Sequence, residues 1–239
     1  MSCIFGLLFL AKLHNYSYYF RLVKKILCHL LILSEKVLIL QTAKCFFTLS
    51  VKFNQSFYYM FNTAEEYKTV LNTCKDVFNN KMLDYGSAWR IMRTESLTDQ
   101  IYIKANRIRS IQRKKETLVN EGVEPEFIGI VNYSAMAVIQ LNLGVTEKPD
   151  LDSNEAVTMY SKVLDEAFYL MQRKNHDYDE AWRNMRISSM TDLILMKLLR
   201  IKSIEDNNGK TVVSEGLDAN YFDIINYAVF CLILINERK

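Results

Sequence analysis

Two cationic residues within an apolar segment are the side chains of this chain best suited to bind a charged ligand. Lys197 and Arg200 lie within residues 193–201, where every other side chain is apolar. The segment therefore predicts a buried helix, and the three-residue spacing places both cations on one face. Burying cations without partners costs on the order of several kcal/mol, so anions must meet them. The candidate anions are a bound phosphate or three nearby acids, Asp192, Glu215 and Asp223.

A phosphate-binding cleft would use the cations that gather in this part of the sequence. They are Lys197, Arg200, Arg186 and Arg183. Arginine binds phosphate oxygens with its planar, forked donors. Tyr178 and Trp182 precede these cations and would stack on a base, although aromatic side chains beside a helix junction more commonly belong to the core.

The same region also suggests a metal site. Asp223 precedes Asn226 by about one helical turn, and Glu215 lies just upstream. Such oxygen ligands suit Mg²⁺, which binds through one or two carboxylates and the phosphates of a substrate. Glu215 and Asp223 are therefore the predicted Mg²⁺ ligands. Acids before a helix, such as Glu215 and Asp218, equally fit an ordinary helix N-terminus.

Signatures of other cofactors are missing from the sequence. The chain has no Cys-x-x-Cys, His-Glu-x-x-His, P-loop or Gly-x-Gly-x-x-Gly motif. Zinc, haem, flavin and NAD are not expected, and no catalytic residue can be assigned. Cys74 and Cys231 lie on apolar helix faces, which predicts buried, inert thiols.

The chemically interesting residues belong to a unit that occurs twice. Residues 81–111 match residues 174–204 at an offset of 93, with 17 of 31 positions identical. Lys104 and Arg107 thus correspond to Lys197 and Arg200. After one inserted residue the match continues at an offset of 94, which places Gly129 opposite Asp223. A ligand or ion-pair interpretation must hold in both units, or one unit has become structural.

Each unit is predicted to form three helices, because apolar residues recur at three- and four-residue spacing. Thr98 and Thr191 are the predicted N-cap residues of the second helices. The sequence predicts an all-α fold of two tandem three-helix repeats, residues 60–143 and 154–239, packed as one helical body. The predicted helices are 64–81, 98–113 and 126–143, then 154–173, 191–206 and 219–236.

Residues 1–59 differ from the rest in composition. They carry seven of the 30 basic residues and one of the 27 acidic ones, so the remaining 180 residues have a net charge of −3. The net charge of +3 for the whole chain is therefore no DNA-binding footprint of the repeats. The basic, aromatic leader indicates either a mis-assigned start, with translation beginning at Met60, or a membrane-associated segment. With a start at Met60 no membrane contact is expected.

Two segments carry a family resemblance: residues 174–186, with Asp177, Tyr178 and Trp182, and residues 213–228, with Glu215 and Asp223. Together they resemble the first nucleotide-modification-associated domain, a bacterial family formerly catalogued as a domain of unknown function. The resemblance spans two tandem copies from about Met60 onward. It implies a role around modified nucleotides or DNA.

The chain is more loosely similar to MazG-type all-α nucleoside triphosphate pyrophosphatases. That family holds Mg²⁺ with a Glu-x-x-Glu helix and a later Glu-x-x-Asp helix. In this sequence Lys197 and Arg200 occupy the helix of the first motif, and Asp223 and Asn226 roughly fit the second. This sequence therefore lacks most of the acidic residues with which that family binds Mg²⁺.

We therefore expect a cytoplasmic protein that binds a nucleotide or another phosphate-bearing ligand between the second and third helices of the second repeat. If it is an enzyme, Mg²⁺-dependent hydrolysis of a nucleoside triphosphate in the MazG manner is the natural reaction. The alternative is a non-catalytic helical interaction module whose buried cations pair only with its own acids. DNA as a partner has no support from the charge of the repeats.

Overall fold

A computed structural model describes residues 63–114, 122–211 and 215–238, and these residues are helical with no strand among them. The predicted leader, residues 1–59, lies outside the described residues. The first repeat contains a helix over residues 63–85, η1 (Ala88–Ile91), α4 (Thr94–Arg113) and α5 (Glu124–Leu143). The second contains α6 (Ser153–Tyr178), η2 (Ala181–Asn184), α7 (Ile187–Asp206) and α8 (Leu217–Asn236). The predicted all-α fold of two three-helix repeats is confirmed.

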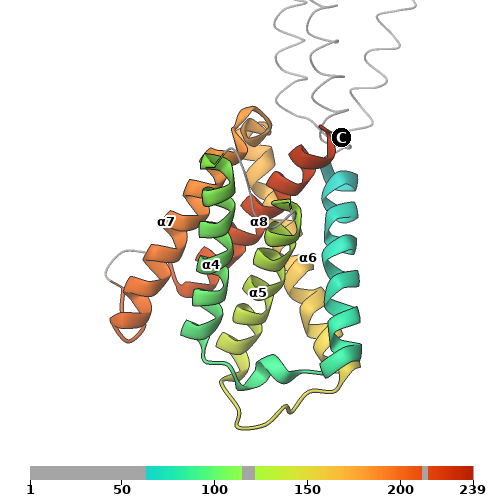
Figure 1. Cartoon of the computed structure of the whole chain (residues 1–239), viewed down its shortest axis with the longest axis vertical. Coiled ribbons are helices and arrows are strands. Elements are labelled where there is room, and N and C mark those ends of the chain that lie inside the picture. The colour runs from blue at the N-terminus through green and yellow to red at the C-terminus, as the bar shows by residue number, and fades with distance from the viewer. Residues whose placement is uncertain (1–62, 115–121, 212–214, 239) are drawn as a thin grey trace, which may run out of the picture. The chain divides into compact units, whose positions relative to one another are not determined.

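Four helices form the centre of the bundle. The helix α4 packs against α5, α5 against α8, α8 against α7, and α7 against α4, so each helix contacts its counterpart in the other repeat as well as its neighbour in its own repeat (Figure 1). Both third helices are apolar around most of their circumference and supply much of the core. By length and composition α8 is apolar enough to cross a membrane, but 72% of the relevant window is buried in the bundle. Its apolar character is therefore explained by core packing.

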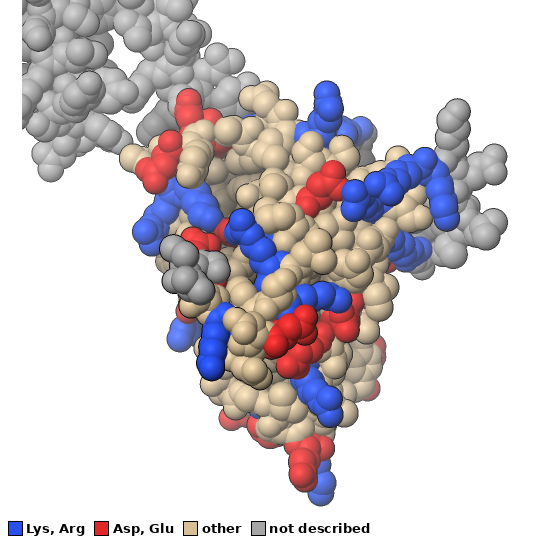
Figure 2. Space-filling view, turned by 90° about the vertical axis from the view of Figure 1, so that its left-hand side faces the viewer, with Lys and Arg blue, Asp and Glu red and all other residues tan. Residues whose placement is uncertain are grey.

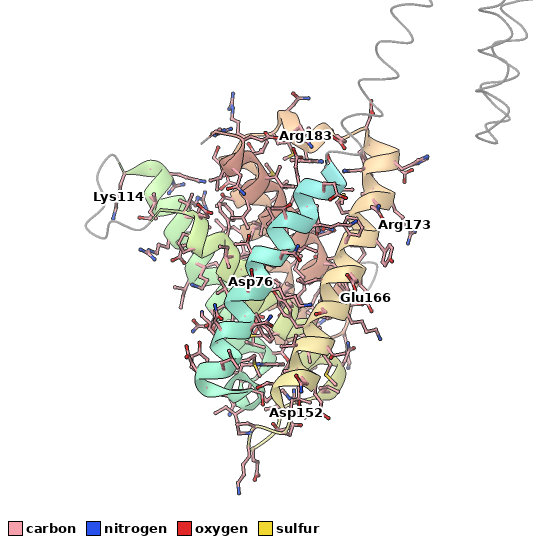
Figure 3. The ribbon with its side chains drawn as sticks, turned by 90° about the vertical axis from the view of Figure 1, so that its right-hand side faces the viewer. Asp76, Lys114, Asp152, Glu166, Arg173 and Arg183 are labelled. Atoms are coloured by element: carbon pink, nitrogen blue, oxygen red, sulfur yellow. The ribbon has the colours of Figure 1, made fainter. Side chains whose placement is uncertain are left out.

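The first helices of the two repeats lie side by side against the centre (Figure 3). Each is bound to the third helix of the other repeat. The Tyr67 hydroxyl donates a hydrogen bond to Asn226, and the Tyr160 hydroxyl donates one of 2.6 Å to Asn132. These two contacts are equivalent under the repeat offsets, so the first helices tie the two repeats together in both directions.

The second helices are joined by a similarly reciprocal pair of contacts. Lys202 lies 2.5 Å from Asp99, and the equivalent Arg109 lies 3.5 Å from Asp192. On the face that α4 and α7 form, positive and negative side chains are interspersed (Figure 2). This mixture does not form the continuous basic stripe that nucleic-acid binding uses.

The helix starts differ from the predicted ones. The helix α4 begins at Thr94 and α7 at Ile187, one turn before the predicted caps. Thr98 and Thr191 lie inside the helices and donate to the carbonyls four residues back, at 3.2 and 2.9 Å. The N-cap prediction is wrong because Arg93 and Arg186, the extended residues two positions after the end of each 3₁₀ turn, are the N-cap residues and make no side-chain cap.

Candidate functional site

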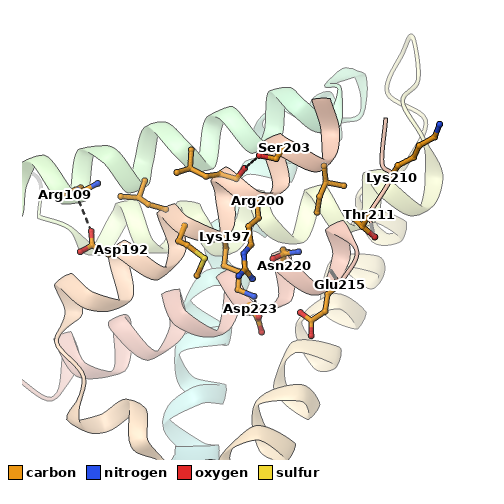
Figure 4. A pocket seen from close by; sticks show the side chains of 14 residues that line it. Arg109, Asp192, Lys197, Arg200, Ser203, Lys210, Thr211, Glu215, Asn220 and Asp223 are labelled. Atoms are coloured by element: carbon orange, nitrogen blue, oxygen red, sulfur yellow. Dashed lines mark hydrogen bonds and ion pairs between the residues drawn. The ribbon is translucent and has the colours of Figure 1, made fainter. Parts of the chain in front are cut away.

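A groove of about 1200 Å³ runs along α7 and the N-terminal half of α8 (Figure 4). Apolar side chains of α7, including Met196 and the 56% exposed Leu199, form part of its wall. Its charged lining consists of Arg109, Lys197, Arg200 and Lys210, with Asp192, Glu215 and Asp223. The groove is in the second repeat, between the helices where the sequence predicts a ligand.

Lys197 and Asp223 form a buried ion pair inside this groove. The Lys197 Nζ lies 2.6 Å from the Asp223 Oδ2, and their side chains are 9% and 10% exposed. Lys174 of α6 binds the other carboxylate oxygen. Of the three acids that the sequence offered, Asp223 is therefore the partner of Lys197.

Sequence reasoning missed the role of Lys174. A signal was present, because Lys174 matches Lys81 in the segment that repeats with an offset of 93 residues. The pairing itself depends on how the end of α6 packs against α8, which the repeat pattern does not encode.

Arg200 differs from Lys197 although it lies on the same side of the helix. It is exposed, and no acid within the described residues forms an ion pair with it. In Figure 4 its side chain points into the groove towards Asp223 and Asn220. Of the two predicted phosphate-binding cations on this face of α7, Lys197 is thus neutralised internally, and Arg200 faces the groove.

The first repeat neutralises the equivalent cations in another way. Lys104 lies 3.3 Å from Glu126, and Arg107 binds the other oxygen of the same carboxylate. Glu126 corresponds to Asn220 in the second repeat at the offset of 94. At the position of the carboxylate that binds Arg107, the second repeat therefore has an amide, which cannot form an ion pair with Arg200.

The first repeat has Gly129 in the place of Asp223, and the position of the Lys104 side chain explains why. A Cβ atom on Gly129 would lie 2.6 Å from the Cε atom of Lys104. The Lys104 side chain thus fills the space that a side chain at this position needs. Each repeat uses one acid of its third helix, Glu126 or Asp223, to bind these cations, and the two positions are displaced by about one helical turn.

Asn220 leaves one polar atom in the groove wall without a partner. Its side chain is 2% exposed, and its Nδ2 donates a 2.8 Å hydrogen bond to the carbonyl of Gly216. The Oδ1 is buried with no hydrogen-bond partner among the described residues. Glu215, just before α8, also lines the groove and forms no ion pair within the described part of the chain.

The other predicted site residues do not line this groove. Arg183 is bound by Glu66, Glu180 and Glu237, and it lies 4.5 Å from the ring of Trp182. Trp182 is 5% exposed and stacks on Phe230 with 4.2 Å between ring centroids. 

The two remaining predicted site residues lie at helix ends. Tyr178 is 70% exposed and is the last residue of α6, and Arg186 is exposed before the first turn of α7. The groove thus brings together Lys197, Arg200, Glu215 and Asp223 of the predicted set, and not Arg183, Arg186, Tyr178 or Trp182.

The donor set of the groove does not fit Mg²⁺. The Asp223 carboxylate is bound by two lysines, so a metal ion would have to displace a cation to reach it. Asp192 is paired with Arg109, which leaves Glu215 as the acid able to approach a metal. Among the described residues no three His, Cys, Asp or Glu side chains gather as a metal-binding group.

A second polar cluster lies at the junction of the repeats. The Thr98 Oγ1 is 2.7 Å from both the Glu205 Oε1 and the Tyr221 hydroxyl. Burial raises the pKa of the Glu205 carboxyl above its usual value, although the hydrogen bond from Thr98 opposes the rise. In the other repeat Gln112 makes the equivalent contact, a 3.1 Å hydrogen bond to Thr191.

The two thiols of the repeats are inert by their environment. Cys74 and Cys231 are both buried and free. Burial raises the pKa of Cys74 to about 12 and that of Cys231 well above its usual value. Neither thiol forms the thiolate that nucleophilic or metal chemistry needs.

Fold and groove together define an all-α tandem-repeat protein with a partly cationic groove in its second unit. Comparison with known families identifies the unit. The family model of the nucleotide modification associated domain 1 matches residues 81–141 and again residues 174–235, over half of the chain. The chain therefore belongs to this family and carries two copies in tandem. No curated protein and no solved structure matches it.

Proposed function

We propose that this protein binds a nucleotide in the groove along α7 and α8, with Arg200 as the main phosphate ligand. The observation that carries the proposal is the substitution of Asn220 for the acid that the first repeat uses. Glu126 neutralises Arg107 in the first repeat, whereas the equivalent Arg200 faces the groove. A guanidinium group at the wall of a partly apolar groove is well suited to a phosphate.

Two further features support a nucleotide over a simple anion. Lys210 adds a second cation at the same groove, and exposed Leu199 offers apolar surface to a base or sugar. Ligand sites generally combine apolar walls with a few polar groups. Binding alone is proposed, because Lys174 and Lys197 both engage Asp223 and leave it unsuited to a metal.

A non-catalytic interaction module is the second candidate. It is favoured by the internal pairing of Lys197 with Asp223 and of Lys104 with Glu126. In that case the cations of the second helices serve stability, and Arg200 is an ordinary exposed residue.

Thermal-shift measurements with nucleoside triphosphates, with and without Mg²⁺, separate the two candidates. We expect stabilisation that persists in a chelator and is lost in Arg200→Gln. Arg186→Gln removes the same charge from the start of the same helix, outside the groove, and should behave as wild type. No stabilisation by any triphosphate would favour the interaction module. Release of pyrophosphate that depends on Mg²⁺ would contradict the restriction to binding.

A further inference from the structure

The Oδ1 atom of Asn220, which has no partner among the described residues, indicates what kind of ligand the groove would bind. Its orientation is fixed, because the Gly216 carbonyl only accepts hydrogen bonds and therefore selects the Nδ2 side of the amide. The Oδ1 is consequently the atom without a partner, in a side chain that is 2% exposed and lines the groove. A buried acceptor without a donor destabilises the fold unless a donor reaches it.

The charged neighbours of Asn220 do not supply this donor. Lys197 and Lys174 both donate to Asp223, which lies one turn further along α8. No hydrogen bond joins Arg200 to Asn220 within the described residues, although Figure 4 shows the two side chains near each other. Among the described residues no donor satisfies Oδ1, so a ligand in the groove can supply one.

A second acceptor lies at the same end of the groove. Glu215 directly precedes Gly216, whose carbonyl holds the Asn220 amide, and its carboxylate forms no ion pair among the described residues. The groove thus presents cations for phosphate and, at the start of α8, two acceptors. A bare polyphosphate would leave both acceptors unused, because it offers oxygen atoms and no N–H groups.

We infer that the nucleotide bound in this groove carries a base with an exocyclic amino group, as cytosine and adenine do. The inference rests on the proposed function, because it assumes that phosphate binds at Arg200. The amino group has two hydrogens, which Asn220 Oδ1 and the Glu215 carboxylate accept. Uracil places a carbonyl oxygen at the same position as the amino group of cytosine, so it would face these acceptors with another acceptor.

The test is calorimetric titration of the full chain with CTP, UTP and inorganic tripolyphosphate. We expect CTP to bind about tenfold more tightly than UTP, since a site built to accept a hydrogen bond rejects a ligand without the donor. Asn220→Leu removes the acceptor at similar volume, and should reduce the preference for CTP while tripolyphosphate still binds. Glu215→Gln, in the exposed segment before α8, should reduce the preference in part and provides a second variant if Asn220→Leu fails to fold.

The possible outcomes separate the inference from the proposed function. Equal affinity of wild type for CTP and UTP would overturn the inference, and so would a preference that survives in both variants. Binding of tripolyphosphate that is lost in Arg200→Gln would support the proposed function whatever the base preference. Failure of all three ligands to bind would overturn the proposed function itself.

Discussion

The two repeats of this protein carry the same pair of cations on their second helices but neutralise them differently. In the first, Glu126 binds both Lys104 and Arg107. In the second, Asp223 binds Lys197 one turn further along the third helix, and Arg200 remains in the groove. A displacement of one carboxylate by a single turn thus separates a closed charge cluster from a groove with an available cation.

The contacts between the two repeats, in contrast, are the same in both directions. Tyr67 and Tyr160 each bind an asparagine of the other repeat, and Asp99 and Asp192 each pair with a cation across the interface. These contacts occur in both directions. The framework is therefore twofold in character, whereas the chemistry of the charged helices is not. This contrast is what duplication allows, because one copy can preserve a structural role while the other changes.

The largest effect should come from the buried acid of the second repeat. Asp223→Asn leaves Lys197, whose side chain is 9% exposed, without an anion, and should lower the free energy of unfolding by about 3 kcal/mol. Glu126→Gln should cost about 1 kcal/mol, because Lys104 and Arg107 are 25% and 34% exposed and can turn to water. Denaturant unfolding of both variants measures the difference. Equal losses would show that the two clusters are equivalent.

Tyr67 and Tyr160 should respond alike to substitution by phenylalanine. Tyr67→Phe and Tyr160→Phe each remove one buried hydrogen bond to an asparagine of the other repeat. We expect each to lower the free energy of unfolding by about 1 kcal/mol. The same unfolding experiment checks this, and a loss confined to one variant would break the twofold framework.

Much of this arrangement could be predicted from the sequence, for identifiable reasons. The period of 93 residues and the apolar spacing located the helices to within a few residues at most ends. The cost of burying Lys197 predicted an acid or a phosphate beside it. The sequence could not choose among Asp192, Glu215 and Asp223, since the choice depends on which turn of α8 faces α7.

Other features required the structure because they depend on contacts between segments far apart in the sequence. A repeat pattern does not say whether Tyr67 packs on its own third helix or on that of the other repeat. Trp182 resembled a base-stacking residue by its position among cations, and its place in the core depends on Phe230, far along the chain. Asn220 carried a signal that could have been used, because alignment of the repeats places it opposite Glu126.

The smallest effect concerns the polar cluster at Thr98. Burial raises the folded-state pKa of Glu205, so the folded chain binds this proton more tightly than the unfolded chain. Its contribution to stability is therefore full below the unfolded pKa and is lost as the pH rises through the folded pKa. Glu205→Gln copies the equivalent Gln112 and should raise the Tm at neutral pH by about 2 °C, with no gain near pH 4. Tm measured across this range checks the sign, and a gain that is the same at both ends would contradict it.

In the function proposed here, Asn220 keeps Arg200 available for a phosphate. Asn220→Glu tests it most directly, because the first repeat shows that a glutamate at this position binds the equivalent arginine. Calorimetric titration with inorganic tripolyphosphate should show one site per chain in wild type and no binding in Asn220→Glu, which should be at least as stable as wild type. Unchanged binding in a folded Asn220→Glu variant would contradict the account.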